Sequence, residues 1–143
     1  MEEFKYDLNY FEYEIINNNI IIKSKEYEID NEELLSIDLT NSYIIKAIND
    51  KGRLPLTYKG ILDKFLIEFS AKKLKEISLF ESRIIDGEYS VKGYNYLEKI
   101  NISYPDLCAN KCIKEILNLI NYLNNNFELI IRLNDGKYIK YKK

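Results

Sequence analysis

The chain of 143 residues contains no histidine and no tryptophan, and it has only two cysteines, two prolines and five glycines. Without histidine, Ser-His-Asp and Cys-His nucleophilic arrangements are excluded, as are all metal sites with histidine ligands. The simplest proton shuttle at neutral pH is absent as well. None of the glycines forms a GxxxxGK(S/T) phosphate loop or a GxGxxG turn. The sequence therefore predicts a protein that is not an enzyme and that holds no cofactor and no metal.

Long apolar runs are also lacking, since no stretch of about 18 apolar residues is present to span a bilayer. The chain opens with Met1-Glu2-Glu3, which is acidic where a secretory signal is positively charged. We therefore expect a soluble, cytoplasmic protein without a signal peptide. Cys108 and Cys112 are four residues apart in a predicted helix, so we expect both on one buried face, without a disulfide.

The net charge is only −2, but it is unevenly distributed. Residues 1–50 hold 12 acidic and 4 basic residues, whereas residues 51–143 hold 11 acidic and 17 basic residues. One interpretation is that the acidic part is directed to cationic partners and the basic part to anionic ones. The other is that the two parts neutralise each other within one folded domain.

The first half of the chain shows the two-residue alternation of β-strands. Residues 10–16 alternate apolar side chains with two glutamates, and the three asparagines that follow tolerate positive φ and predict a hairpin turn. Pro55 cannot donate a hydrogen bond to a neighbouring strand, so a strand that contains it is expected at a sheet edge. Further strands are expected at residues 20–25, 27–29, 42–48 and 54–58, with a helical turn at 31–35.

The middle of the chain is less regular. Residues 65–69 are rich in strand formers, whereas Ala71, Leu74 and Ile77 recur at helical spacing, so the boundary between strand and helix stays open. Asp86-Gly87 lies between two short apolar runs and predicts a tight hairpin that joins residues 83–85 to residues 88–91.

One long amphipathic helix is expected at about residues 106–126. A capping-type start with Pro105 precedes it, an apolar stripe runs along it, and three asparagines end it. A C-terminal hairpin follows, with strands at 127–133 and 137–142 around Asn134-Asp135-Gly136. These patterns predict an α+β fold in which the helix packs on an antiparallel sheet built from hairpins, as one domain over residues 1–143.

The C-terminal hairpin carries basic side chains among aromatic ones. Such a combination can hold phosphates or lipid headgroups, which makes an anionic ligand or lipid the candidate partner of this hairpin. Lysines on an edge strand also serve simply to prevent aggregation between sheets, and no RNA-binding or helix-turn-helix motif accompanies them. The candidate contacts are Arg132, Lys137, Tyr138, Lys140, Tyr141, Lys142 and Lys143.

Tyrosine occurs 13 times, and its apolar ring with a polar tip favours protein interfaces. The candidate interface residues are Tyr6, Tyr10, Tyr13, Tyr94 and Tyr96.

Paired carboxylates are the remaining candidates for catalysis or metal binding, because alternate acids on a strand share one face and could hold a divalent cation. The same pattern is typical of a solvated strand face. The acids in question are Glu12, Glu14, Glu26, Glu28 and Asp30.

The composition, with 23 isoleucines and 16 asparagines, is typical of an AT-rich genome such as that of a clostridium. In size, tyrosine content, lack of histidine and predicted α+β character, the chain resembles the smallest ORF-X protein encoded beside clostridial neurotoxins. The resemblance implies a non-enzymatic accessory protein that pairs with a larger ORF-X protein and can be released with a toxin complex. It also implies a tubular lipid-binding fold with a long helix in a curved antiparallel sheet.

Three hypotheses follow from the sequence. The first is a binding or accessory protein that acts through a protein surface, with anionic lipid at the basic hairpin. The second is a small immunity or anti-defence inhibitor whose acidic first 50 residues cover a basic site. The third is a metal-dependent enzyme that uses carboxylates.

Overall fold

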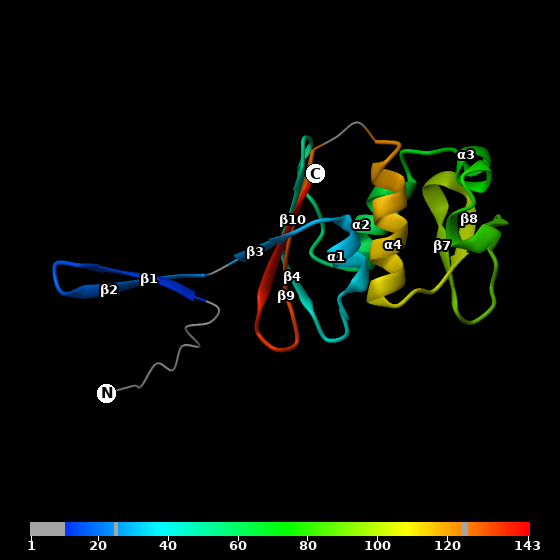
Figure 1. Ribbon diagram of the computed structural model, residues 1–143. Helices are drawn as coiled ribbons and strands as arrows, with labels where there is room; N and C mark the ends of the chain where they lie inside the picture. Colours follow the sequence, from blue (N-terminus) through cyan, green and yellow to red (C-terminus); the bar gives the residue numbers. More distant parts are fainter. Residues whose placement is uncertain (1–10, 25, 124–125) are drawn as a thin grey trace.

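Figure 1 shows the computed structural model of the chain, which describes residues 11–24, 26–123 and 126–143. It is an α+β fold with short helices and mostly antiparallel strands. The helices are α1 (Asn31–Ser36), α2 (Tyr58–Leu66), α3 (Ala71–Glu76) and α4 (Ala109–Ile120). The strands are β1 (Phe11–Ile16), β2 (Asn19–Ser24), β3 (Glu26–Ile29), β4 (Tyr43–Asn49), β5 (Gly52–Arg53), β6 (Ile85–Asp86), β7 (Tyr94–Leu97), β8 (Ile102–Pro105), β9 (Phe127–Arg132) and β10 (Tyr138–Lys142).

The strands form three sheets. Among the described residues, the largest sheet has five strands in the order β3-β10-β9-β4-β5, a second has the order β6-β8-β7, and the third consists of β1 and β2. Neighbouring strands are antiparallel except β3 and β10, which are parallel. The expected fold class is therefore confirmed, and the parallel pair is an addition that hairpin patterns do not indicate. No helix in the described part of the chain has the length and apolar character that a membrane span requires.

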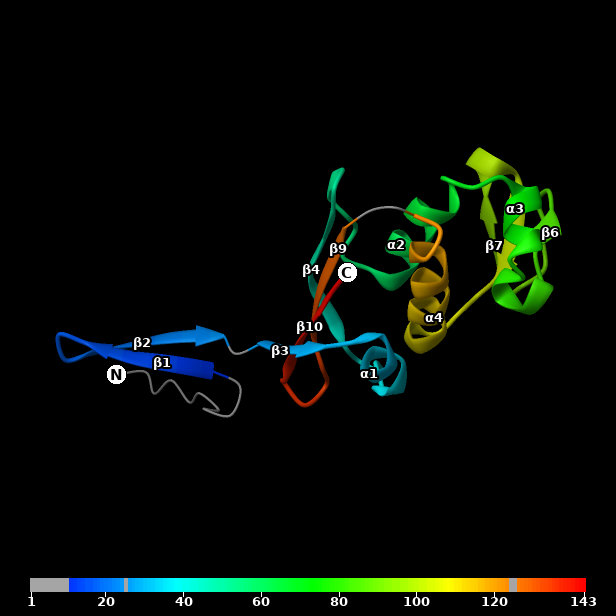
Figure 2. The same cartoon turned by 45° about the horizontal axis from the view of Figure 1, so that its top comes forward.

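Helices α1, α2 and α4 lie on one side of the five-stranded sheet and separate it from the three-stranded sheet, beside which α3 lies, as both views show (Figures 1 and 2). The apolar face of α4 is buried over most of its length. Strand β9 directs Phe127, Leu129 and Ile131 into the same core, which follows from the strand period of two residues. Burial of this many apolar side chains is the main stabilising contribution to the fold. No helix of the described residues lies over the other face of the five-stranded sheet (Figures 1 and 2).

The predicted helix at about 106–126 is correct in kind but too long. The helix starts at Ala109, because residues 102–105 form β8 in the centre of the three-stranded sheet. Ser103 is fully buried there, and its hydroxyl donates to Gly87 O at 2.7 Å and accepts from Tyr89 N at 2.9 Å. Its side chain is thus committed to the sheet and does not cap the helix.

The predicted hairpin at Asp86-Gly87 is wrong. Gly87 has the positive φ that such a turn requires, at +80°, but β6 pairs with β8 and not with residues 88–91. The Gly87 N–H donates to Asn101 O at 2.7 Å, which extends that pairing. A partner some 15 residues away in the sequence therefore displaces the local hairpin.

The expected strand at 54–58 is wrong, because residues 54–57 form no strand and Tyr58 begins α2. The strand that pairs with β4 at this edge of the described sheet is Gly52–Arg53, just before Pro55. Thr57 then caps α2, since its side chain accepts from Gly60 N at 3.0 Å. Residues 65–69, for which the sequence left strand or helix open, form the end of α2 and the start of the connection to α3.

The first hairpin and the last one form as predicted. Asn17 and Asn18 take positive φ of 50° and 65° between β1 and β2, which is the geometry of a tight hairpin turn. Strands β9 and β10 pair in antiparallel register around Asn134-Asp135-Gly136, and Gly136 has a φ of +88°. In Figures 1 and 2 the β1–β2 hairpin extends away from the five-stranded sheet.

Candidate functional site

One face of the five-stranded sheet is covered by none of the described helices, and we call it the outer face. It is built by strand alternation. In β10, Ile139 and Tyr141 point into the core, so Tyr138, Lys140 and Lys142 occupy the opposite face. Ile130 of β9 is paired with Lys140 of β10 on one side and with Lys46 of β4 on the other. Apolar and basic side chains therefore share this face.

A groove of about 480 Å³ lies on the outer face beside the short edge strand β5. It exists because the register between β4 and β9 shifts between Ile44 and Lys46, a β-bulge that turns Ile45 outward, where it is 49% exposed. Leu56 is 56% exposed where the chain leaves β5. The lining residues are Ile45, Lys46, Ala47, Ile48, Arg53, Leu54, Leu56, Ile130 and Tyr138.

The groove has a positive rim. Lys46 and Arg53 line it, and the lining residues within the described part of the chain include no acid. Next to it, the ammonium groups of Lys46 and Lys140 both lie 3.4 Å from Glu128 Oε1. Burial by itself would raise the pKa of Glu128, but the two lysines hold it below its ordinary value. One carboxylate shared by two lysines leaves a net positive charge on this part of the face.

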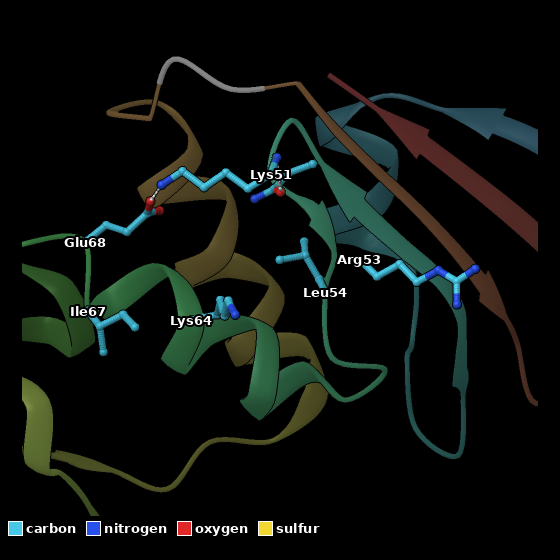
Figure 3. A pocket seen from close by; sticks show the side chains of 7 residues that line it. Lys51, Arg53, Leu54, Lys64, Ile67 and Glu68 are labelled. Carbon is cyan, nitrogen blue, oxygen red and sulfur yellow. Dashed lines mark hydrogen bonds and ion pairs between the residues drawn. The ribbon is translucent and has the colours of Figure 1, made fainter.

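A second hollow of about 330 Å³ adjoins the groove between β5 and the end of α2 (Figure 3). Arg53 and Leu54 line both hollows, so the two meet at the edge strand. Figure 3 shows Lys51 reaching from the β4–β5 turn to an ion pair with Glu68, while Arg53 points away from that pair. Lys51 is thus partly neutralised, and Arg53 is directed to the outer face.

The basic residues of the C-terminal hairpin do not form one patch. The Lys137 ammonium lies 4.5 Å from the centre of the Tyr27 ring, and the Lys143 ammonium donates to Ile120 O at 3.0 Å. Arg132 and Lys142 are exposed on the outer face. Of the basic residues predicted to contact an anionic ligand, some therefore lie on the outer face, whereas others make contacts within the fold.

Tyr141 does not belong to a surface at all. It is 4% exposed, it packs near Phe127, and its hydroxyl hydrogen-bonds Asn31 Oδ1. Burial raises the pKa of its phenol. The prediction that Tyr141 contacts an anionic ligand or lipid is therefore wrong, because strand alternation directs it into the core. Tyr138, by contrast, lines the groove.

The candidate interface tyrosines are spread over distant parts of the chain. Tyr94 and Tyr96 lie on β7 in the three-stranded sheet, whereas Tyr13 lies on β1 at the far end of the molecule (Figure 1). The Tyr96 hydroxyl donates to Asn101 Oδ1 at 2.7 Å, and the Tyr94 ring makes an edge contact with Tyr89. Tyr6 and Tyr10 lie outside the described residues. The structure thus gathers no common tyrosine surface from the members that it describes.

The groove residues Ile45, Leu56 and Arg53 were missed by the sequence reasoning. Simple alternation over residues 42–48 puts Ile45 on the same face as Ala47, and only the bulge separates them. A bulge depends on the register with β9, about 80 residues away, so no local signal indicates it. Pro55 was the one available hint, because it marks the irregular edge at which the groove opens.

The candidate metal ligands are not brought together where the structure describes them. Glu28 is exposed, and Asp30 caps α1 by accepting from Glu33 N at 2.9 Å. Glu12, Glu14 and Glu26 lie on described strands, but their side chains fall outside the description. Within the described residues, no three His, Cys, Asp or Glu side chains lie close enough together to hold a metal ion.

Acids of the first 50 residues serve local structure in several places. Asp38 accepts from Thr40 N at 3.0 Å, and its pKa is lowered by hydrogen bonds from the Thr40 hydroxyl and from this N–H. Asp50 accepts from both nitrogens of Asn126 at 3.0 Å, which ties the β4–β5 turn to the start of β9. These carboxylates act as turn and cap acceptors.

The two cysteines have different surroundings. Cys112 is buried on α4, and burial raises the pKa of its thiol to about 11, so it stays protonated at neutral pH. Cys108 is exposed at the N-cap of the same helix. The expectation that both are buried on one face is therefore wrong for Cys108, because the helix begins one residue after it. Both thiols are free, as predicted.

No family model, no curated protein and no solved structure matches this chain.

Proposed function

We propose that this protein is a non-enzymatic binding protein that recognises an acidic, partly apolar segment of a protein partner through the groove on its outer face. The observation that carries the proposal is the groove itself, with exposed Ile45 and Leu56 beside Lys46 and Arg53. Apolar side chains surrounded by charged ones are the usual anatomy of a protein interface. The positive rim favours an acidic partner and suppresses basic ones.

The resemblance to the smallest ORF-X protein is consistent with this role and narrows the partner. If it holds, the partner is a larger ORF-X-type protein, and the groove is where the two meet. A positive rim would then speed association, and the rate would fall as salt is added, since charges on the rim act mainly on the rate of encounter.

A groove variant tests the proposal. We expect affinity capture from the native source to retain a protein partner with the wild type and to lose it with Ile45→Glu/Leu56→Glu, because two carboxylates would repel an acidic segment. Leu35→Glu is the matched control, since Leu35 is equally exposed but lies on α1 away from the groove lining. Equal capture by the groove variant and the control would contradict the proposal.

Anionic lipid is the second candidate ligand, and exposed Arg132 and Lys142 on the outer face favour it. We expect Arg132→Glu/Lys142→Glu to abolish sedimentation with phosphatidylserine vesicles, because each cation near the surface contributes about 1 kcal/mol of attraction. Thermal stability should change little, since both side chains are exposed. Lys72→Glu/Lys111→Glu, two exposed lysines on α3 and α4, is the control. Unaltered vesicle binding by the first variant would exclude this contact.

A further inference from the structure

The five-stranded sheet is incompletely paired along the edge formed by β5. Strand β5 pairs only with the last two residues of β4, and a single further bond from Leu54 N to Ala47 O at 2.8 Å extends this pairing. The next residue, Pro55, has no N–H to donate. In the described part of the chain, residues 43–46 of β4 therefore lie beside β9 on one side and beside no strand on the other.

The segment that follows β5 is held by α2 and leaves the sheet. Residues 54–57 form no strand, and the Thr57 side chain accepts from Gly60 N at 3.0 Å to cap the helix. A Cβ atom on Gly60 would lie only 2.7 Å from Pro55 Cβ, so Pro55 packs closely against the first turn of α2. Because this segment is fixed to the helix, it does not extend the pairing along β4.

The groove on the outer face follows this open edge. Four of its lining residues, 45–48, are consecutive in β4, and Leu54 and Leu56 come from the segment that leaves the sheet. A strand added to β4 would run about 4.8 Å from it, so its side chains would lie in this space. Tyr43, Ile45 and Leu56 are exposed along the edge, where natural sheets usually place charged side chains.

The charges beside the edge determine which kind of strand fits. Lys46 and Arg53 line the groove. Arg53 and Lys64 line the adjoining hollow, where Glu68 is the one acid among the described lining residues of both hollows and is paired with Lys51. A segment with acidic side chains is therefore attracted to this edge, and a basic segment is repelled.

We propose that the acidic partner segment binds in an extended conformation, as an added β-strand along residues 43–47 of β4. The proposal rests on the function proposed above and states how the groove holds its partner. Backbone hydrogen bonds to β4 supply affinity, while apolar side chains of the segment pack on Ile45 and Leu56 and its carboxylates lie near Lys46 and Arg53. Five residues of a strand span about 17 Å, so a segment of about five to seven residues is sufficient.

Two methylated peptides test the backbone contact. The probe is a fluorescent peptide of about seven residues in which glutamate alternates with isoleucine, and we expect the wild-type protein to raise its fluorescence anisotropy. Alternate N–H groups of a strand point to opposite edges. N-methylation of one alternate set should therefore weaken binding at least about tenfold, because several hydrogen bonds are lost, whereas methylation of the other set should change it little. A peptide with lysine in place of glutamate should not bind.

Protein variants locate the contact. The groove variant Ile45→Glu/Leu56→Glu and the charge variant Arg53→Glu should each bind the unmodified peptide at least about tenfold more weakly, because both place carboxylates beside the acidic segment. Leu35→Glu, on α1 away from the groove lining, should bind like the wild type. Circular dichroism shows whether each variant is folded. If the groove variant is not, the two methylated peptides with the wild type decide the question.

Three results would overturn the added strand. They are equal affinities of the two methylated peptides, equal binding of the unmodified peptide by the groove variant and the wild type, and no binding of this peptide by the wild type. The function proposed above still stands in each case if the groove variant loses the protein partner that the wild type captures. It fails if the groove variant and Leu35→Glu capture that partner equally.

Discussion

Replacement of Phe127 by alanine is expected to lower the free energy of unfolding by about 3–5 kcal/mol, the usual cost of removing a large buried aromatic side chain. Phe127 is 2% exposed at the first position of β9. Its ring meets the Phe65 ring edge-on at 5.6 Å between centroids and lies 6.1 Å from the Tyr141 ring. It thus joins α2 to the sheet and to the last strand.

Urea denaturation of Phe127→Ala beside the wild type measures this effect. The control is Leu56→Ala, which truncates an exposed side chain and should change the free energy of unfolding by less than about 0.5 kcal/mol. Since a domain of this size has a total stability of about 5–15 kcal/mol, the Phe127 variant is expected to be visibly less stable or unfolded at 37 °C. A loss comparable to that of the control would show that the three rings do not form a packed core.

Replacement of Glu115 by alanine is expected to cost about 1–3 kcal/mol, because it leaves a buried backbone donor without a partner. Glu115 on α4 is 7% exposed, and its Oε2 accepts from Phe80 N at 2.6 Å. Phe80 lies in a short turn in which Ser78, Phe80 and Glu81 all take positive φ near 55°. Such left-handed backbone is costly for residues other than glycine, so the turn depends on this bond.

Replacement of Glu115 by glutamine should have a different effect. Burial raises the pKa of Glu115 above its ordinary value of 4.5, with Glu81 acting in the same direction, although the Phe80 N–H and Lys114 oppose the shift. A carboxyl with a raised pKa in the folded state contributes stability that is fully present below the unfolded pKa and is lost as the pH rises through the folded pKa. Glutamine keeps the acceptor without the charge, so this loss should disappear.

Denaturation curves of the wild type, Glu115→Gln and Glu115→Ala between pH 4 and pH 8 check both expectations. The wild type should lose stability relative to Glu115→Gln as the pH rises above 4.5, the ordinary pKa of the carboxyl. Glu115→Ala should be the least stable of the three over the whole range. A constant difference between the wild type and the glutamine variant would mean that the pKa of Glu115 is not raised in the folded state.

The two ends of the described chain were predictable because their signals are local. Three asparagines after an alternating run specify the β1–β2 turn, and Asn134-Asp135-Gly136 specifies the β9–β10 turn, since these residues tolerate positive φ. The stripe of apolar residues on α4 was equally predictable from the sequence, because helical spacing puts these residues on one side of the helix. Each of these features requires only neighbours in the sequence.

The candidate site was much less predictable. Lys140 and Tyr138 were named because basic and aromatic residues alternate in the last strand, and both lie on or beside the groove. Tyr141 was named for the same reason and is buried, since alternation sends every second side chain of β10 inward. The pattern identified the strand. Which of its two faces is exposed depends on which face of the sheet the helices cover, and the sequence pattern does not contain that information.

Local sequence patterns were sufficient to predict the α+β class, the first and last hairpins and the amphipathic character of α4, because backbone conformation and periodicity depend on adjacent residues. Contacts between distant segments were needed for the parallel pairing of β3 with β10, the pairing of β6 with β8 in place of a local hairpin, and the bulge that opens the groove. Each of these is a hydrogen-bonded register between segments that are distant in the chain. Such a register depends on which apolar faces are buried together, and no local pattern contains that information.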